Sequence, residues 1–106
     1  MAKTIEHPKP LEKTMDILKP YRAKIDAIDD QIIDLLVARA GVIREVGAIK
    51  KEYNIPVILP DRVEEVIERC AARAESQGLD PALVRCLYTM LVDHACDTEE
   101  RIIQNP

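Results

Sequence analysis

The residues with the clearest potential for chemistry are two cations, Arg39 and Lys50, in the stretch 21–53. They stand eleven residues apart, about three helical turns, so on a helix both side chains project in nearly the same direction. That direction lies among apolar residues such as Ile32 and Ile43. A buried cation needs a carboxylate partner or an anionic ligand, unless its stem is covered while its head reaches water. The residues alone leave an ion pair and an anion-binding site equally open.

A single long helix must hold these cations. Residues 21–53 contain no proline and one helical stripe of apolar residues: Ile25, Ile28, Ile32, Leu35, Leu36, Val42, Ile43, Val46 and Ile49. Arg22 lies about a quarter-turn from Arg39 around this helix, so it points towards a different neighbour. The helix is roughly 48 Å long at about 1.5 Å per residue, which exceeds the width of a compact chain of this size. We therefore expect either an elongated protein or a helix shared with a partner chain.

Two shorter helices follow the long one. Residues 54–60 contain two prolines, so they form an extended connector. Helices are expected over 61–77 and 81–103, because Gly78 suits the end of the first and Asp80 suits the N-cap of the second. The fold is thus all-α, with three helices of which one is very long. Such helices do not close around one core in a monomer, so we expect an intertwined homodimer with the long helices packed together.

The composition limits the possible functions. The chain has 106 residues and a formal net charge of −4, which argues against nucleic-acid binding because such proteins usually carry a basic face. Its three cysteines and two histidines lack metal-ligand spacing, so we expect no metal, and free thiols suit a reducing compartment. No apolar run would cross a membrane and residues 1–20 lack the apolar core of a signal peptide. These features favour the cytoplasm.

The N-terminal region is predicted to differ from the rest of the chain. Residues 1–18 are rich in lysine and proline and are expected to form a mobile arm, with a short helical turn over 11–18. The long helix is expected to begin just after Pro20, which suits the first turn of a helix. Residues 19–106 then form the helical domain.

The order of charged residues along the chain carries a family resemblance. Arg22, Arg39 and Lys50 follow one another on one helix, Asp61-Arg62 comes after a proline-containing loop, and Gly-Leu-Asp opens the third helix. This order resembles the all-helical (AroQ-class) chorismate mutases, which include related isochorismate-pyruvate lyases. The resemblance covers Lys19 to Ile103 and is closest in the family's first helix, over residues 22–29, 35–39 and 45–50. It implies intertwined helical dimers that rearrange chorismate to prephenate in one pericyclic step, without cofactor or metal.

The resemblance also implies a role for each cation. Arg39 matches an arginine that grips one substrate carboxylate within its own subunit. Arg22 matches an arginine that crosses into the partner's site to grip the other carboxylate. Lys50 matches a lysine bonded to the ether oxygen and a carboxylate, and Arg62 matches an arginine that lines the site near the loop. The implied substrate is a small dicarboxylate held in sites that two subunits share.

The residue types agree with this chemistry. The rearrangement requires neither a nucleophile nor a proton shuttle, so the protein has to hold the flexible substrate in a chair-like shape. It must also stabilise the negative charge that builds on the ether oxygen as the bond breaks, and Lys50 is the candidate for that task. Arginine suits the carboxylate grips because its planar fork binds both oxygens.

Several positions depart from the family pattern. Val63 stands where the family often has a glutamate bonded to the ring hydroxyl, and Leu59 replaces an acidic loop residue but keeps its backbone N–H. Glu99 stands where a glutamine usually donates to the ether oxygen, and Ala95 replaces a nearby serine. With Val63 at this position the chain also resembles the isochorismate-pyruvate lyases, so a lyase on the same scaffold is one alternative. A non-catalytic helical dimer is another, although such a protein would more often lose one of the three cations.

Glu99 leads to a hypothesis about pH. An ionised carboxylate repels the ether oxygen, whereas a protonated one donates a hydrogen bond to it. We therefore expect activity to fall as the pH rises and Glu99 loses its proton, and Glu99→Gln to flatten that dependence. The alternative is a salt bridge between Glu99 and Lys50. Tyr88, His94 and Met90 are expected to be packing or surface residues.

Overall fold

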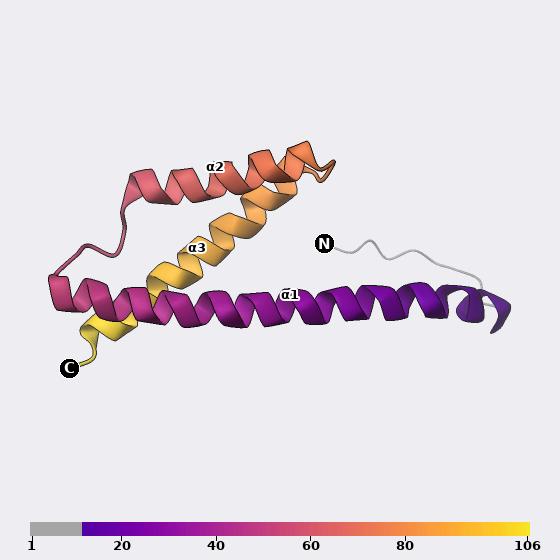
Figure 1. Ribbon diagram of the computed structural model, residues 1–106, viewed down its shortest axis with the longest axis horizontal. Coiled ribbons are helices and arrows are strands. Elements are labelled where there is room, and N and C mark those ends of the chain that lie inside the picture. The colour runs from indigo at the N-terminus through magenta and orange to yellow at the C-terminus, as the bar shows by residue number, and fades with distance from the viewer. Residues whose placement is uncertain (1–11) are drawn as a thin grey trace, which may run out of the picture. The chain divides into compact units, whose positions relative to one another are not determined.

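Three α-helices form the part of the chain that the structure describes. The computed structural model describes residues 12–106 and contains α1 (Glu12–Tyr53), α2 (Pro60–Ser76) and α3 (Pro81–Gln104), which are labelled in Figure 1. Within these residues there is no strand, so the prediction of an all-α fold with one very long helix is confirmed. The chain divides into two units, Met1–Val37 and Ala38–Pro106, and α1 contributes to both.

The start of α1 differs from the prediction. The helix begins at Glu12 rather than after Pro20, and Pro20 lies inside it. An internal proline removes one backbone hydrogen bond and usually breaks a helix, which is why the sequence favoured a later start. The preceding residues 12–19 include glutamate, lysine, methionine and leucine, which are strong helix formers. Residues 12–18 of the predicted arm are therefore helical, whereas residues 1–11 lie outside the described residues.

The apolar side chains in the N-terminal part of α1 are not buried within one chain. Ile25, Ile28 and Ile32 are 56%, 55% and 48% exposed, and Leu35 is 70% exposed. Among the residues of α1 whose burial the structure describes, only Gly47 is buried. The N-terminal part of the predicted apolar face is therefore open in the single chain, whereas Ile43 and Val46 further along α1 are half-buried.

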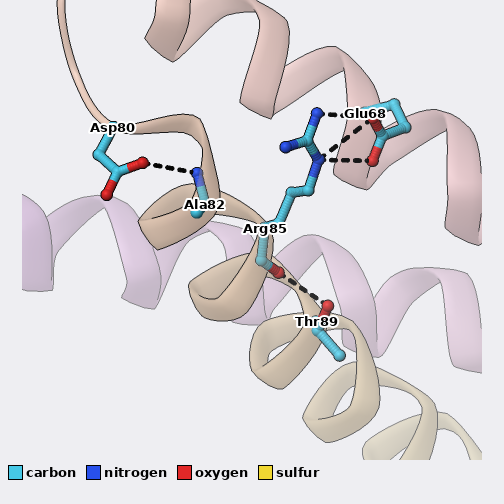
Figure 2. Close-up of polar contacts among 5 residues, drawn as sticks. All are labelled: Glu68, Asp80, Ala82, Arg85 and Thr89. Atoms are coloured by element: carbon cyan, nitrogen blue, oxygen red, sulfur yellow. Dashed lines mark hydrogen bonds and ion pairs between the residues drawn. The ribbon is translucent and has the colours of Figure 1, made fainter.

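The short helices α2 and α3 pack against each other and hold the chain's buried apolar residues. The buried residues are small, namely Ala71, Ala74, Val84, Val92 and Ala95, which lets the two helices approach closely. On their outer side, the Arg85 guanidinium donates three hydrogen bonds of 3.0 to 3.2 Å to the Glu68 carboxylate (Figure 2). These hydrogen bonds lower the pKa of Glu68 and raise that of Arg85, but the pair is exposed and contributes little to stability.

The turns at the helix ends follow the predicted capping residues. The Asp80 side chain accepts a 2.9 Å hydrogen bond from the Ala82 backbone N–H, as Figure 2 shows, so the predicted N-cap of α3 is confirmed. Gly78 has a φ of +79° after the end of α2, which confirms it as the predicted stop. Asn54 follows α1 with a φ of +56°, and asparagine tolerates this left-handed conformation. No described helix has the length and apolarity to cross a membrane.

Gly78 gives a direct test of these turns. A Cβ at this position would meet no atom within 4 Å, so the cost of Gly78→Ala is that of the left-handed backbone alone. We expect Gly78→Ala to lower the free energy of unfolding by about 1 kcal/mol, measured by urea denaturation. Gly78→Asn should cost less, because asparagine tolerates positive φ. Equal losses for the two variants would contradict this explanation.

Candidate active site

The unit Ala38–Pro106 contains a cavity of about 390 Å³ between the C-terminal part of α1, the connector, α2 and α3. Such a volume suits a small organic molecule. Much of the wall is aliphatic and comes from all four segments: Val42, Ile43, Val46, Val57, Val66 and Val92. This apolar wall limits water around any charged group in the cavity, which strengthens electrostatic contacts with a ligand.

The charged residues of the cavity wall are mostly cations. Arg39 and Lys50 come from α1, Arg62 and Arg69 come from α2, and Glu99 on α3 is the only carboxylate among the lining residues. Within residues 12–106, neither Arg39 nor Arg69 has a salt bridge. The site is therefore locally positive in a chain whose net charge is −4, and it favours a ligand with more than one negative charge.

Lys50 and Glu99 form a buried ion pair in the wall. Lys50 Nζ lies 2.7 Å from Glu99 Oε1, and the two side chains are only 13% and 6% exposed. The same ammonium donates a 2.7 Å hydrogen bond to the Val57 carbonyl. Glu99 Oε1 nevertheless has no hydrogen bond of good geometry within the described residues. Its contact with Lys50 is therefore an ion pair whose angles do not meet those of a hydrogen bond. A donor from a ligand, or a proton, would satisfy that oxygen.

Most of the predicted site residues meet in this cavity. Arg39, Lys50 and Glu99 line it together with three residues at the start of α2: Leu59, Arg62 and Val63. Arg62 also pairs with Glu65 at the surface, where both side chains are more than half exposed. Its guanidinium is therefore held at the edge of the cavity.

Arg22 is the predicted site residue that the cavity of one chain does not include. It is exposed on the part of α1 that belongs to the unit Met1–Val37. Its different bearing on the helix had led us to expect a different neighbour for it. The neighbour expected for Arg22 stays a prediction.

Arg69 is a lining residue that the sequence prediction missed. It stands seven residues after Arg62, which is about two helical turns, so both guanidiniums lie on the same side of α2. This spacing could have identified it, just as the spacing of Arg39 and Lys50 did on α1. Tyr88 and Cys96 also line the cavity, although Tyr88 had been expected to serve only packing or the surface.

Comparison with known proteins decides the family of this chain. The sequence model of the family described as "Chorismate mutase type II" matches residues 21–100. The chain belongs to the type II chorismate mutase family. This membership confirms the predicted family and identifies the chain as an isomerase.

Individual relatives include mutases of two kinds. A 4-amino-4-deoxychorismate mutase of Streptomyces pristinaespiralis is 31% identical over 88 residues, which are 83% of this chain and 68% of that protein. A chorismate mutase of Methanocaldococcus jannaschii is 27% identical over 77 residues, 73% of this chain and 78% of that protein. A bifunctional chorismate mutase/prephenate dehydratase of Aquifex aeolicus is 40% identical over 55 residues, 52% of this chain but only 15% of that protein.

Cys96 allows the cavity to be probed without turnover. Burial raises the pKa of the Cys96 thiol, and the nearby Glu99 carboxylate adds to the rise. Because the thiolate is the reactive form, we expect iodoacetamide to modify Cys96 more slowly than the exposed Cys86 at neutral pH. A dicarboxylate bound in the cavity should slow Cys96 further and leave Cys86 unchanged, as measured by peptide mass spectrometry. Equal protection of both thiols would contradict a ligand site in this cavity.

Proposed function

We propose that this protein converts chorismate to prephenate by positioning the substrate and stabilising the charge of the transition state. The observation that carries the proposal is the convergence of Arg39, Lys50, Arg62 and Arg69 on one cavity whose only lining carboxylate is Glu99. Chorismate has two carboxylates and an ether oxygen, so this excess of cations suits it. The family membership supports the same reaction.

Each proposed role follows from the place of the residue in the wall. Arg39 has no carboxylate partner within residues 12–106, so its fork is available to bind one substrate carboxylate through two hydrogen bonds. Lys50 donates one N–H to Val57 and has further donors for the ether oxygen, where negative charge develops. These two residues and Glu99 make up the proposed catalytic set.

The start of α2 supplies the remaining contacts on this side of the proposed site. Leu59 is the N-cap of α2, and Arg62 and Val63 lie in its first turn, where the helix dipole favours an anion. Arg62 binds at the edge of the site and the Leu59 N–H lies beside the ring. Val63 packs against the ring and offers no hydrogen bond to its hydroxyl.

The active form that we propose is an intertwined homodimer. Its support is the open apolar face of α1, on which Ile25, Ile28 and Ile32 are each about half exposed. A contiguous apolar surface of this kind usually marks an interface. A second copy would cover the face and bring its own Arg22 to the second carboxylate of the substrate. Each cavity would then depend on two chains.

The proposed setting of the enzyme is the cytoplasm. All three cysteines are free, which suits a reducing compartment. The helical domain is proposed to comprise residues 19–106, which contain all the proposed site residues, although α1 itself begins at Glu12. The reaction as proposed uses no cofactor and no metal.

A turnover assay with chorismate, isochorismate and 4-amino-4-deoxychorismate tests the function. We expect prephenate from chorismate to form fastest, measured by chromatography of the products. Pyruvate and salicylate from isochorismate, with little prephenate, would instead establish a lyase and make Val63 its marker. If none of the three substrates reacts, the proposal of a mutase is wrong and the non-catalytic alternative stands.

The second candidate substrate is 4-amino-4-deoxychorismate, because two relatives are named for its rearrangement. This compound carries an amine in place of the ring hydroxyl. A ring ammonium needs a carboxylate partner, yet the residue near the ring is Val63 and the only lining carboxylate, Glu99, is paired with Lys50. We therefore expect slower turnover of the amino compound than of chorismate in the same assay.

Arg39→Ala tests the proposed carboxylate grip. Loss of a charge-assisted bond of about 1.5–3 kcal/mol should lower kcat/KM by about 10- to 150-fold. Arg44→Ala is the matched control, because Arg44 is an exposed arginine on the same helix that does not line the cavity. If both variants lose activity equally, Arg39 has no specific role.

Glu99→Gln tests the proposed need for a proton on Glu99. In the structure Glu99 pairs with Lys50, which is the alternative that the sequence left open. With substrate bound, we propose that a protonated Glu99 donates to the ether oxygen, so wild-type kcat should be higher at acidic than at neutral pH. The glutamine amide of the variant donates at every pH, so the variant should show a flat profile. A wild-type profile that is already flat would rule out this role for Glu99.

A further inference from the structure

Gly47 lies where α1 contacts α3. It is the one buried residue among those of α1 whose burial the structure describes. A Cβ added at this position would lie 2.9 Å from Ile102 Cδ1 and 3.4 Å from Glu99 Cα. Real Cβ atoms essentially never show a contact as short as the first. The two helices therefore cross at a distance that only glycine permits without a shift of α3 or its side chains.

The same crossing carries the charged contacts of the site. Lys50 lies one turn after Gly47, and its ammonium is 2.7 Å from the carboxylate of Glu99. Lys51 donates to the carbonyl of Asn105 just beyond the end of α3. Glu99 is thus both the residue whose backbone faces the missing side chain of Gly47 and the ion-pair partner of Lys50. A change in the spacing of the two helices at residue 47 would therefore change the position of Glu99 relative to Lys50.

A second glycine in α1, Gly41, has no close neighbour on α3. Gly41 has only the Arg44 Nη2 atom near its added Cβ, at an ordinary contact distance of 3.6 Å. Alanine is a far better helix former than glycine, so alanine at residue 41 would favour the helix without a clash. At residue 47 the same change would bring the new methyl group to 2.9 Å from the end of the Ile102 side chain and to 3.4 Å, a tight contact, from Glu99 Cα. The two positions therefore separate the intrinsic effect of glycine from the effect of the helix crossing.

We propose that Gly47 is a positioning residue, whose missing side chain sets the distance at which Lys50 and Glu99 meet in the site. The proposal rests on the proposed function insofar as it assigns Lys50 and Glu99 to the reaction. Gly47 itself touches no substrate. It acts by letting α3 lie close enough for the Glu99 carboxylate to hold the Lys50 ammonium inside the cavity.

The test compares the same substitution at two glycines. Gly47→Ala should lower kcat by about tenfold, because displacements of about 1 Å at a reacting group are costly, and should change KM by less than about threefold. Gly41→Ala should keep the wild-type kcat and KM. Circular dichroism and thermal unfolding give the folded fraction of each variant, so that kcat is stated per folded enzyme. A kcat of Gly47→Ala equal to that of Gly41→Ala would overturn the proposal.

A compensating change removes the atom that the new methyl group meets. Ile102→Val deletes Cδ1, the atom at 2.9 Å, so the double variant Gly47→Ala/Ile102→Val should recover kcat to within about threefold of Ile102→Val alone. A merely structural glycine would show recovery of thermal stability without recovery of kcat. That pattern would also overturn the proposal.

A structural readout separates this proposal from the proposed function. If the wild-type protein does not turn over chorismate, the function is wrong, but crystal structures of the two alanine variants still test the positioning. The separation of Lys50 Nζ and Glu99 Oε1 should lengthen beyond ion-pair contact in Gly47→Ala and stay near the wild-type 2.7 Å in Gly41→Ala. An unchanged ion pair in Gly47→Ala would contradict the positioning role whatever the activity.

Discussion

A buried ion pair between Lys50 and Glu99 sets the arrangement on which the cavity depends. Removing two charges from water is costly and is offset only when they are closely paired and further hydrogen-bonded. Here the 2.7 Å contact joins α1 to α3, and the Val57 carbonyl ties the connector to the same ammonium. Three segments of the chain are thus fixed around one cation. In the positioning role that we propose for Gly47, its missing side chain lets α1 and α3 lie close enough for this pair to form.

The remaining cations of the wall make the cavity suitable for an anionic ligand. Arg39, Arg62 and Arg69 line it, and Arg39 and Arg69 have no salt bridge within residues 12–106, so their positive charge is available to a ligand. A one-step rearrangement of a dicarboxylate needs this kind of site, because the enzyme contributes position and charge rather than a nucleophile. The cavity of one chain lacks Arg22, and α1 exposes much of its apolar face. In the proposed homodimer, a second copy resolves both deficits.

The sequence predicted those features that depend on local spacing. Asp80 and Gly78 act at the helix ends as expected, and the eleven-residue interval brought Arg39 and Lys50 to one cavity. The predicted start of α1 after Pro20 was wrong, because the rule that proline breaks a helix ignores the helix formers on both sides of Pro20. The prediction missed Arg69, although its seven-residue spacing from Arg62 could have identified it. Which of the two interpretations of Glu99 holds without ligand depends on tertiary contacts, so no local pattern could decide it.

The central claim is that two chains complete each active site, and mixing two inactive variants tests it most directly. Arg22→Ala and Arg39→Ala would each be purified, then unfolded, mixed in equal amounts and refolded together. In a mixed dimer one site contains both arginines and the other contains neither, so random pairing predicts recovery of about a quarter of the wild-type rate. A mixture that stays as inactive as either variant alone, while the refolded wild type is fully active, would contradict the claim.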